Sequence, residues 1–180
     1  FTQEELGEAV RLAHSLKKRV YLTLNALFRN QDFEGFPEYL LRIKEMGIDA
    51  VIVSDPGVMQ CCLEAGLEVH LSTQASTLNA QSAAFWHRQG VKRIVLAREI
   101  TLAEAAEIAQ NAPDGLELEA FIHGAMCIAY SGRCLLSSVL TGRSGNKGEC
   151  AQPCRWRYTI HEAGYPEEYF PIEEDENGAY

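Results

Sequence analysis

Two apolar patterns alternate along the first two thirds of the chain. Short runs of three to five mostly apolar residues are each followed by a longer segment whose apolar residues recur three and four positions apart. Buried parallel strands give the first pattern, and amphipathic helices give the second. The patterns predict strands at 20–24, 50–53, 69–71, 93–96 and 116–122, and helices at 2–17, 36–46, 56–65, 78–89 and 102–109.

Local signals at the ends of the predicted helices support these assignments. Thr2 with Glu5, and Thr101 with Glu104, have the spacing of a capping box, in which each side chain satisfies a backbone N–H group of the first turn. Pro56 stands at a predicted first turn, where its missing N–H group costs nothing. We therefore expect the first and last of these helices to begin at their threonine caps.

Alternating strands and helices predict an α/β fold with a parallel sheet. The regular spacing favours a (β/α) barrel over a doubly wound sheet. Five units are fewer than the eight of a complete barrel, so residues 1–122 are expected to form a partial TIM-like barrel. The pattern breaks at 123–158, a Gly-rich and Cys-rich irregular segment, and residues 159–180 read as an acidic linker toward a missing C-terminal region.

Composition and charge narrow the class of protein. The chain is 47% hydrophobic, enough for one core, and no apolar run reaches the roughly 20 residues of a membrane helix. The beginning of the chain does not resemble a signal peptide, so a cytoplasmic location is expected. A net charge of −9 argues against nucleic-acid binding by the whole surface. Residues 131–158 are an exception with one acid and five cations: Arg133, Arg143, Lys147, Arg155 and Arg157.

Polar residues stand at the C-terminal ends of the predicted strands, where parallel α/β folds place their chemistry. Asp55 is a candidate catalytic residue or a helix cap, and Gln74 follows another strand. Arg98 and Glu99 form a simple ion pair, or Arg98 grips a carboxylate or phosphate through its planar fork. For His123 the sequence leaves open a general acid or base, a hydrogen-bond donor beside a metal cluster, and a structural role.

Four of the six cysteines share the irregular segment. Cys127, Cys134, Cys150 and Cys154 follow the spacing C-x6-C-x15-C-x3-C, and glycines nearby allow the backbone to turn closely. Structural zinc prefers shorter C-x2-4-C pairs, whereas a [4Fe–4S] cluster accepts varied spacing. Spacing alone favours the cluster over zinc or no metal. At least one of the adjacent Cys61 and Cys62 is expected to face the core from a helix, with burial as a small apolar residue as the default.

The residues around these cysteines resemble a known family. The segments 119–127, 132–137 and 148–156 are similar to the signature of the collagenase-like peptidases, unclassified peptidase family 32. Residues 54–57 and 71–75 resemble further segments of the family, so the likeness covers most of 1–160. It also implies strands before residue 1 and a further domain after residue 180, which makes the chain part of a longer protein.

The resemblance implies an activity that the family name does not state. Several members are hydroxylation factors for tRNA wobble uridine, ribosomal RNA or a ubiquinone precursor, and carry a [4Fe–4S] cluster on four cysteines. The pairs here most resemble the tRNA uridine members, which implies RNA as substrate, prephenate as a small carboxylic acid cosubstrate, and a partner subunit of the same family. Two other functions stay open: the peptidase of the family name, and a non-catalytic cluster-bearing scaffold. Neither a G-x-S-x-G nor an HExxH peptidase motif occurs in the chain.

Overall fold

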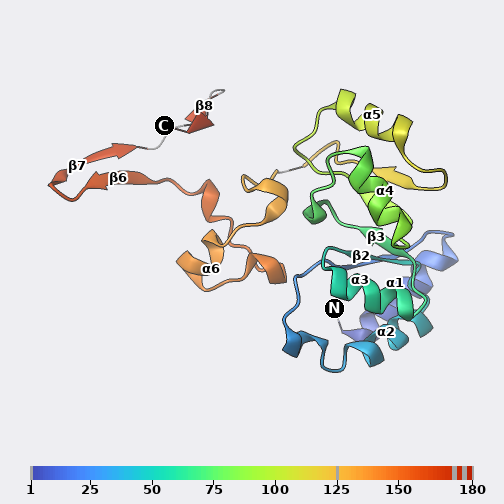
Figure 1. The fold of residues 1–180 in the computed structure, drawn as a ribbon. Coiled ribbons are helices and arrows are strands. Elements are labelled where there is room, and N and C mark those ends of the chain that lie inside the picture. The colour runs from blue at the N-terminus through green and yellow to red at the C-terminus, as the bar shows by residue number, and fades with distance from the viewer. Residues whose placement is uncertain (1, 125, 172–173, 176–177, 180) are drawn as a thin grey trace. The chain divides into compact units, whose positions relative to one another are not determined.

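The computed structural model describes residues 2–124, 126–171, 174–175 and 178–179, and the chain divides into two units, Phe1–Cys134 and Leu135–Tyr180. The first unit alternates helices and strands (Figure 1). Its helices and strands are α1 (Gln3–Ser15), β1 (Tyr21–Leu24), α2 (Phe36–Glu45), β2 (Ala50–Val53), α3 (Pro56–Glu64), β3 (Val69–Leu71), α4 (Ala80–Arg88), β4 (Arg93–Val95), α5 (Leu102–Asn111) and β5 (Glu117–Glu119). Short 3-10 turns are η1 (Asn30–Phe33), η2 (Thr73–Ala75) and η3 (Tyr130–Gly132).

The five strands form one parallel sheet in the order β1-β2-β3-β4-β5. This confirms the predicted α/β alternation. Among the described residues β1 and β5 are the two edges of the sheet, and whether the sheet belongs to a closed barrel stays a prediction. Because all strands run in the same direction, their C-terminal ends meet along one edge.

The core lies between the central strands and the apolar faces of the helices. Val51 and Val53 of β2 are fully buried, which explains the uninterrupted apolar run of that strand. Leu40 and Ile43 of α2 share the helical face that packs into this core. Both predicted capping boxes are confirmed, since Thr2 caps α1 and Thr101 caps α5 through reciprocal hydrogen bonds.

The last strand of the sheet is shorter than the sequence predicts. An apolar run to Ile122 indicates a strand, but the structure ends β5 at Glu119. Its only strand neighbour among the described residues, β4, ends at Val95, so the ladder stops where Val95 faces Glu119. His123 therefore lies in the loop beyond the sheet and is exposed, rather than directly at a strand end.

The second unit holds the rest of the cysteine-rich segment and two antiparallel strand pairs. Its elements are α6 (Leu136–Thr141), η4 (Gly145–Lys147), η5 (Pro153–Arg155), β6 (Thr159–Glu162), β7 (Tyr165–Pro171), β8 (Glu174–Asp175) and β9 (Gly178–Ala179). The sequence predicted no strands in the acidic segment 159–180, but β6 and β7 pair around a two-residue turn at 163–164, and the linker toward a further region stays a prediction. The β-branched residues Thr159 and Ile160 and the aromatic residues Tyr165, Tyr169 and Phe170 favour strands despite the acids. Residues 172–173, 176–177 and 180 of that segment lie outside the described residues.

Candidate functional site

Side-chain hydrogen bonds tie the C-terminal ends of the central strands together. The Ser54 hydroxyl, after β2, donates to Gln74 Oε1 in η2 over 2.8 Å. The Thr73 hydroxyl donates to the Leu96 carbonyl after β4 over 2.9 Å. These bonds join three neighbouring strand ends, so the polar residues predicted there form one connected edge.

Asp55 acts in this structure as a helix cap. One carboxylate oxygen accepts hydrogen bonds from the N–H groups of Gly57 and Val58 at the start of α3, at 2.7 and 3.2 Å. The other oxygen accepts from the Phe28 N–H group at 3.2 Å and so fixes the loop after β1. The capping alternative is confirmed, and a catalytic role for Asp55 stays a prediction.

Glu99 binds the segment that lies between two of the cysteines. Its carboxylate accepts a 2.5 Å hydrogen bond from the Ser131 N–H group and a 3.3 Å bond from the Ser131 hydroxyl. Burial alone would raise the pKa of the Glu99 carboxyl, but these hydrogen bonds outweigh it and lower the pKa below its usual value. In this structure Glu99 is a hydrogen-bond acceptor for Ser131, and a catalytic role for Glu99 stays a prediction.

Arg133 forms a second tether from the same segment. Its Nε and one terminal nitrogen donate to the Gln74 carbonyl, at 3.1 and 2.8 Å. Both oxygens of Gln74 thus accept hydrogen bonds, since its side-chain oxygen accepts from Ser54. The sequence predicts Arg133 as an RNA contact and Gln74 as catalytic; the structure places both in a contact between residues 59 positions apart.

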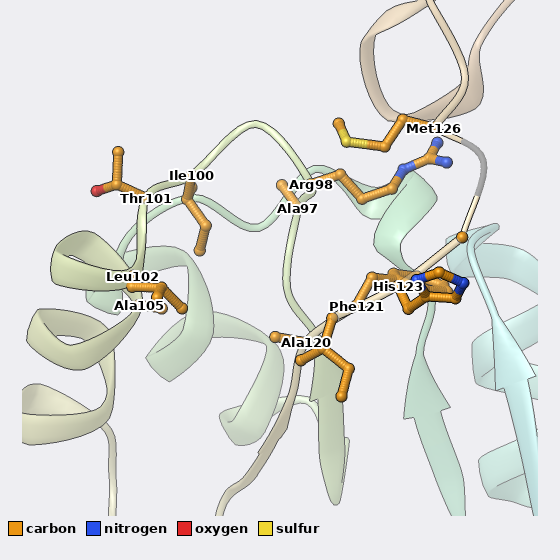
Figure 2. Close-up of a pocket in the computed structure, with 12 residues that line it drawn as sticks. Ala97, Arg98, Ile100, Thr101, Leu102, Ala105, Ala120, Phe121, His123 and Met126 are labelled. Atoms are coloured by element: carbon orange, nitrogen blue, oxygen red, sulfur yellow. The ribbon is translucent and has the colours of Figure 1, made fainter.

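Arg98 and His123 line one pocket of about 400 Å³. Figure 2 shows both beside Phe121 and Met126, on the connections that follow β4 and β5. The Arg98 guanidinium lies 6.0 Å from the centre of the Phe121 ring, and its buried Nε has no hydrogen-bond partner among the described residues. A buried donor without a partner is costly, so this position favours an oxyanion ligand.

The pocket separates the predicted catalytic residues into two groups. Arg98 and His123 are brought together, whereas Asp55, Gln74 and Glu99 are not among the lining residues. Phe121 and Met126 were missed by sequence reasoning because they look like ordinary core positions. For Phe121 the signal was the predicted strand at 116–122, which runs past the end of β5 and leaves Phe121 61% exposed.

The four cysteines are divided between the two units. Cys127 and Cys134 lie in the first and Cys150 and Cys154 in the second; all six cysteines of the chain are described, and none forms a disulfide. No group of three or more His, Cys, Asp or Glu side chains in the described residues is placed to hold a metal ion. The four-cysteine site thus stays a prediction.

The donor chemistry around the second cysteine pair fits an iron–sulfur cluster. The Gln152 N–H group donates to Cys150 Sγ at 3.3 Å, and Gln152 adopts a left-handed conformation with φ of 56°. Hydrogen bonds to cysteine sulfur are among the features that tune such clusters. The buried Ser137 hydroxyl donates to the Arg143 carbonyl and accepts from the Ala151 N–H group, which anchors this loop to α6.

Four of the five predicted RNA-binding cations belong to the second unit. Arg143, Lys147, Arg155 and Arg157 are exposed, and none forms an ion pair with another described residue. Trp156 stands between two of them and is 50% exposed. Unpaired cations around an accessible aromatic ring are a suitable surface for phosphates and an unstacked base.

Comparison with known proteins identifies the family. The model of Peptidase family U32 matches residues 1–180, and the chain belongs to that family. A solved structure of the U32 peptidase Mk0906 has a TM-score of 0.53 and 20% identity, over 66% of this chain and 51% of that one, which shows the common fold.

Two curated relatives carry names that concern RNA. The chain is 41% identical over 164 residues to tRNA hydroxylation protein P1 of Bacillus subtilis, covering 90% of this chain and 38% of that protein. It is 37% identical over 157 residues to 23S rRNA 5-hydroxycytidine C2501 synthase of Escherichia coli, covering 87% of this chain and 24% of that protein. The chain thus spans well under half of the length of these relatives. No helix among the described residues has the length and apolar character needed to cross a membrane.

Proposed function

We propose that this chain is the catalytic part of an iron–sulfur-dependent RNA hydroxylation enzyme acting on tRNA wobble uridine in the cytoplasm. The observation that carries the proposal is the position of the Cys127 and Cys134 loop. Its tethers to Glu99 and Gln74 hold it at the C-terminal edge of the sheet, within the same unit as the Arg98 and His123 pocket. The names of the relatives support RNA as the substrate.

In this proposal the four cysteines hold a [4Fe–4S] cluster as thiolates. Cys127 is half-buried and Cys134 exposed, so both sulfurs lie near the surface of the loop, and Cys150 already accepts an N–H hydrogen bond. A bound cluster supplies one-electron redox chemistry at such a site.

Arg98 and His123 give the pocket its role in the proposal. Hydroxylation exchanges a C–H bond of the uracil ring for a C–OH bond, so a co-reactant must supply the oxygen and accept the hydrogen. A small hydroxylated carboxylic acid, prephenate by the family resemblance, fits a pocket lined by Arg98, because a guanidinium binds carboxylates and the Arg98 Nε has no hydrogen-bond partner among the described residues. His123 is exposed beside it and available to move a proton. A partner subunit of the same family is the expected assembly partner.

The peptidase function has less support in the described residues. Ser131 is fully buried and bonded to Glu99, and the Ser137 hydroxyl donates to a backbone carbonyl. Neither hydroxyl contacts a histidine among the described residues, so the arrangement of nucleophile and base that a serine peptidase needs is not present there.

Two measurements test the proposal. Anaerobically purified protein is expected to be brown and to contain about four irons per chain, whereas a colourless zinc-loaded protein would contradict it. Nucleoside mass spectrometry of tRNA from a deletion strain should show loss of 5-hydroxyuridine derivatives. The wild-type gene and a Cys61→Ser control should restore them, and Cys127→Ser should not. Unchanged 5-hydroxyuridine derivatives in tRNA, together with a lost hydroxylation in ribosomal RNA, would indicate that the substrate is rRNA.

A further inference from the structure

We infer that Glu99 and Arg133 are positioning residues that hold residues 126–134 on the sheet edge before any metal binds, so that Cys127 and Cys134 are placed in advance. The inference deepens the proposed function and rests on it for the identity of the metal. It assigns to two charged side chains a task that neither the family name nor the fold explains. Both contacts lie wholly within the first unit.

The first contact is a charged hydrogen bond to a buried backbone group. Ser131 has no exposed surface, and its N–H group finds its acceptor in the Glu99 carboxylate, 32 residues away in the sequence. Hydrogen bonds to ionised groups are roughly twice as strong as neutral ones, and a buried N–H group left without a partner is costly. Losing the carboxylate therefore releases the middle of the loop.

The second contact fixes the end of the loop beside Cys134. The Arg133 fork places two donors on the Gln74 carbonyl, and Arg133 directly precedes the cysteine. A planar guanidinium that donates twice to one oxygen allows little rotation. The contact therefore fixes the position of the backbone that leads into Cys134.

The backbone between the two contacts is in a conformation that needs such support. Ser131 has φ of 49° and Gly132 φ of 78°, so two consecutive residues are left-handed. For a non-glycine residue this conformation is strained. A Cβ atom at Gly132 would lie 3.3 Å from Arg98 Nη2, so the loop passes closely over the arginine of the pocket. Glu99 and Arg133 together thus couple the cysteine loop to the pocket wall.

Hydrogen exchange of the metal-free protein tests the contact directly. In Glu99→Ala we expect exchange of the Ser131, Gly132 and Arg133 amides to rise about tenfold, as the loss of one charged hydrogen bond allows. Glu99→Gln keeps a neutral acceptor of the same length and should give a smaller rise. Amides of 147–151 in the second unit and of β2 should be unchanged, which shows that the fold is intact. Glu107→Ala, which removes an exposed glutamate of α5, is the matched control.

A second measurement separates positioning from mere local stability. After anaerobic reconstitution, Glu99→Ala and Arg133→Lys should show a shifted midpoint potential of the cluster or fewer irons per chain, and Arg88→Lys, at an exposed position of α4, should match wild type. Equal exchange in wild type and Glu99→Ala would overturn the inference. So would raised exchange with an unchanged potential and iron content. A wild-type protein that binds no iron would contradict the proposed function, while the exchange experiment still decides the contact.

Discussion

At the residue scale, Arg98 differs from the other charged residues of the sheet edge. Asp55, Glu99 and Arg133 each satisfy backbone groups, whereas the buried Nε of Arg98 has no partner among the described residues. Arg93, by contrast, is paired with Glu117, which raises its pKa. An arginine held against an aromatic ring, with a buried donor that no described residue satisfies, is suited to bind an anion.

Replacing Arg98 tests this assignment. Arg98→Lys keeps the charge but loses the fork, and we expect a KM increase for the small acid of about tenfold or more, because one charged hydrogen bond is lost. Arg98→Ala should lose more. Arg42→Lys, on the exposed end of α2, is the matched control. An unchanged KM for Arg98→Lys would place the acid elsewhere.

At the element scale, the sequence predicts those features that depend on interactions between residues close together in the chain. The capping boxes at Thr2 and Thr101 fix where α1 and α5 begin, and both were predicted because their partners stand three residues away. The end of β5 was not, since it depends on where β4 stops. The Arg133 contact with Gln74 spans 59 residues and leaves no trace in any local pattern.

Asp55 allows a test of structural against catalytic function. We expect Asp55→Ala to lower the free energy of unfolding by about 1–2 kcal/mol, because α3 loses its cap. Asp55→Asn keeps the capping oxygen but loses the acceptor of the Phe28 N–H group, so its loss in urea unfolding should be smaller than that of Asp55→Ala. If Asp55→Asn folds normally yet abolishes hydroxylation, the catalytic prediction holds; retained activity would leave Asp55 as a cap alone.

The buried face of α2 predicts where the fold is most sensitive. Leu40 is 1% exposed, and Leu40→Ala should lower the free energy of unfolding by about 2–5 kcal/mol, since it leaves a cavity in the core. The neighbouring Leu41 is 56% exposed, and Leu41→Ala is the matched control, with an expected change within about 0.5 kcal/mol. Similar losses from both variants would contradict the burial of this face.

At the scale of the whole molecule, acid should loosen the first unit at its N-terminal helix. Asp49 accepts hydrogen bonds from His14 of α1 and from the Val20 N–H group before β1, both on Oδ2. Burial would raise the Asp49 pKa, but these contacts and nearby positive charge lower it below the usual value. A lowered pKa in the folded state gives stability that is full above the unfolded-state pKa and is lost as pH falls through the folded one.

Asp49→Asn should therefore flatten the pH dependence of unfolding. Wild type is expected to lose more stability than the variant between neutral pH and about pH 3, because only wild type must protonate a hydrogen-bonded carboxylate. Urea unfolding at both pH values measures this difference. Parallel losses in the two proteins would show that acid acts elsewhere.

The charge distribution gives the prediction that bears most directly on RNA. The chain is net negative, so binding depends on the local cations of the second unit, and log Kd should vary linearly with log salt concentration. Replacing Arg155 and Arg157 together with alanine should reduce that slope by roughly 1.4 to 1.8, as expected for two lost phosphate contacts. Arg133→Ala should change the slope little, because the Arg133 guanidinium already donates to the Gln74 carbonyl. A slope that falls equally for Arg133→Ala would assign Arg133 to RNA, and an unchanged slope in the double variant would move the RNA-binding surface away from the second unit.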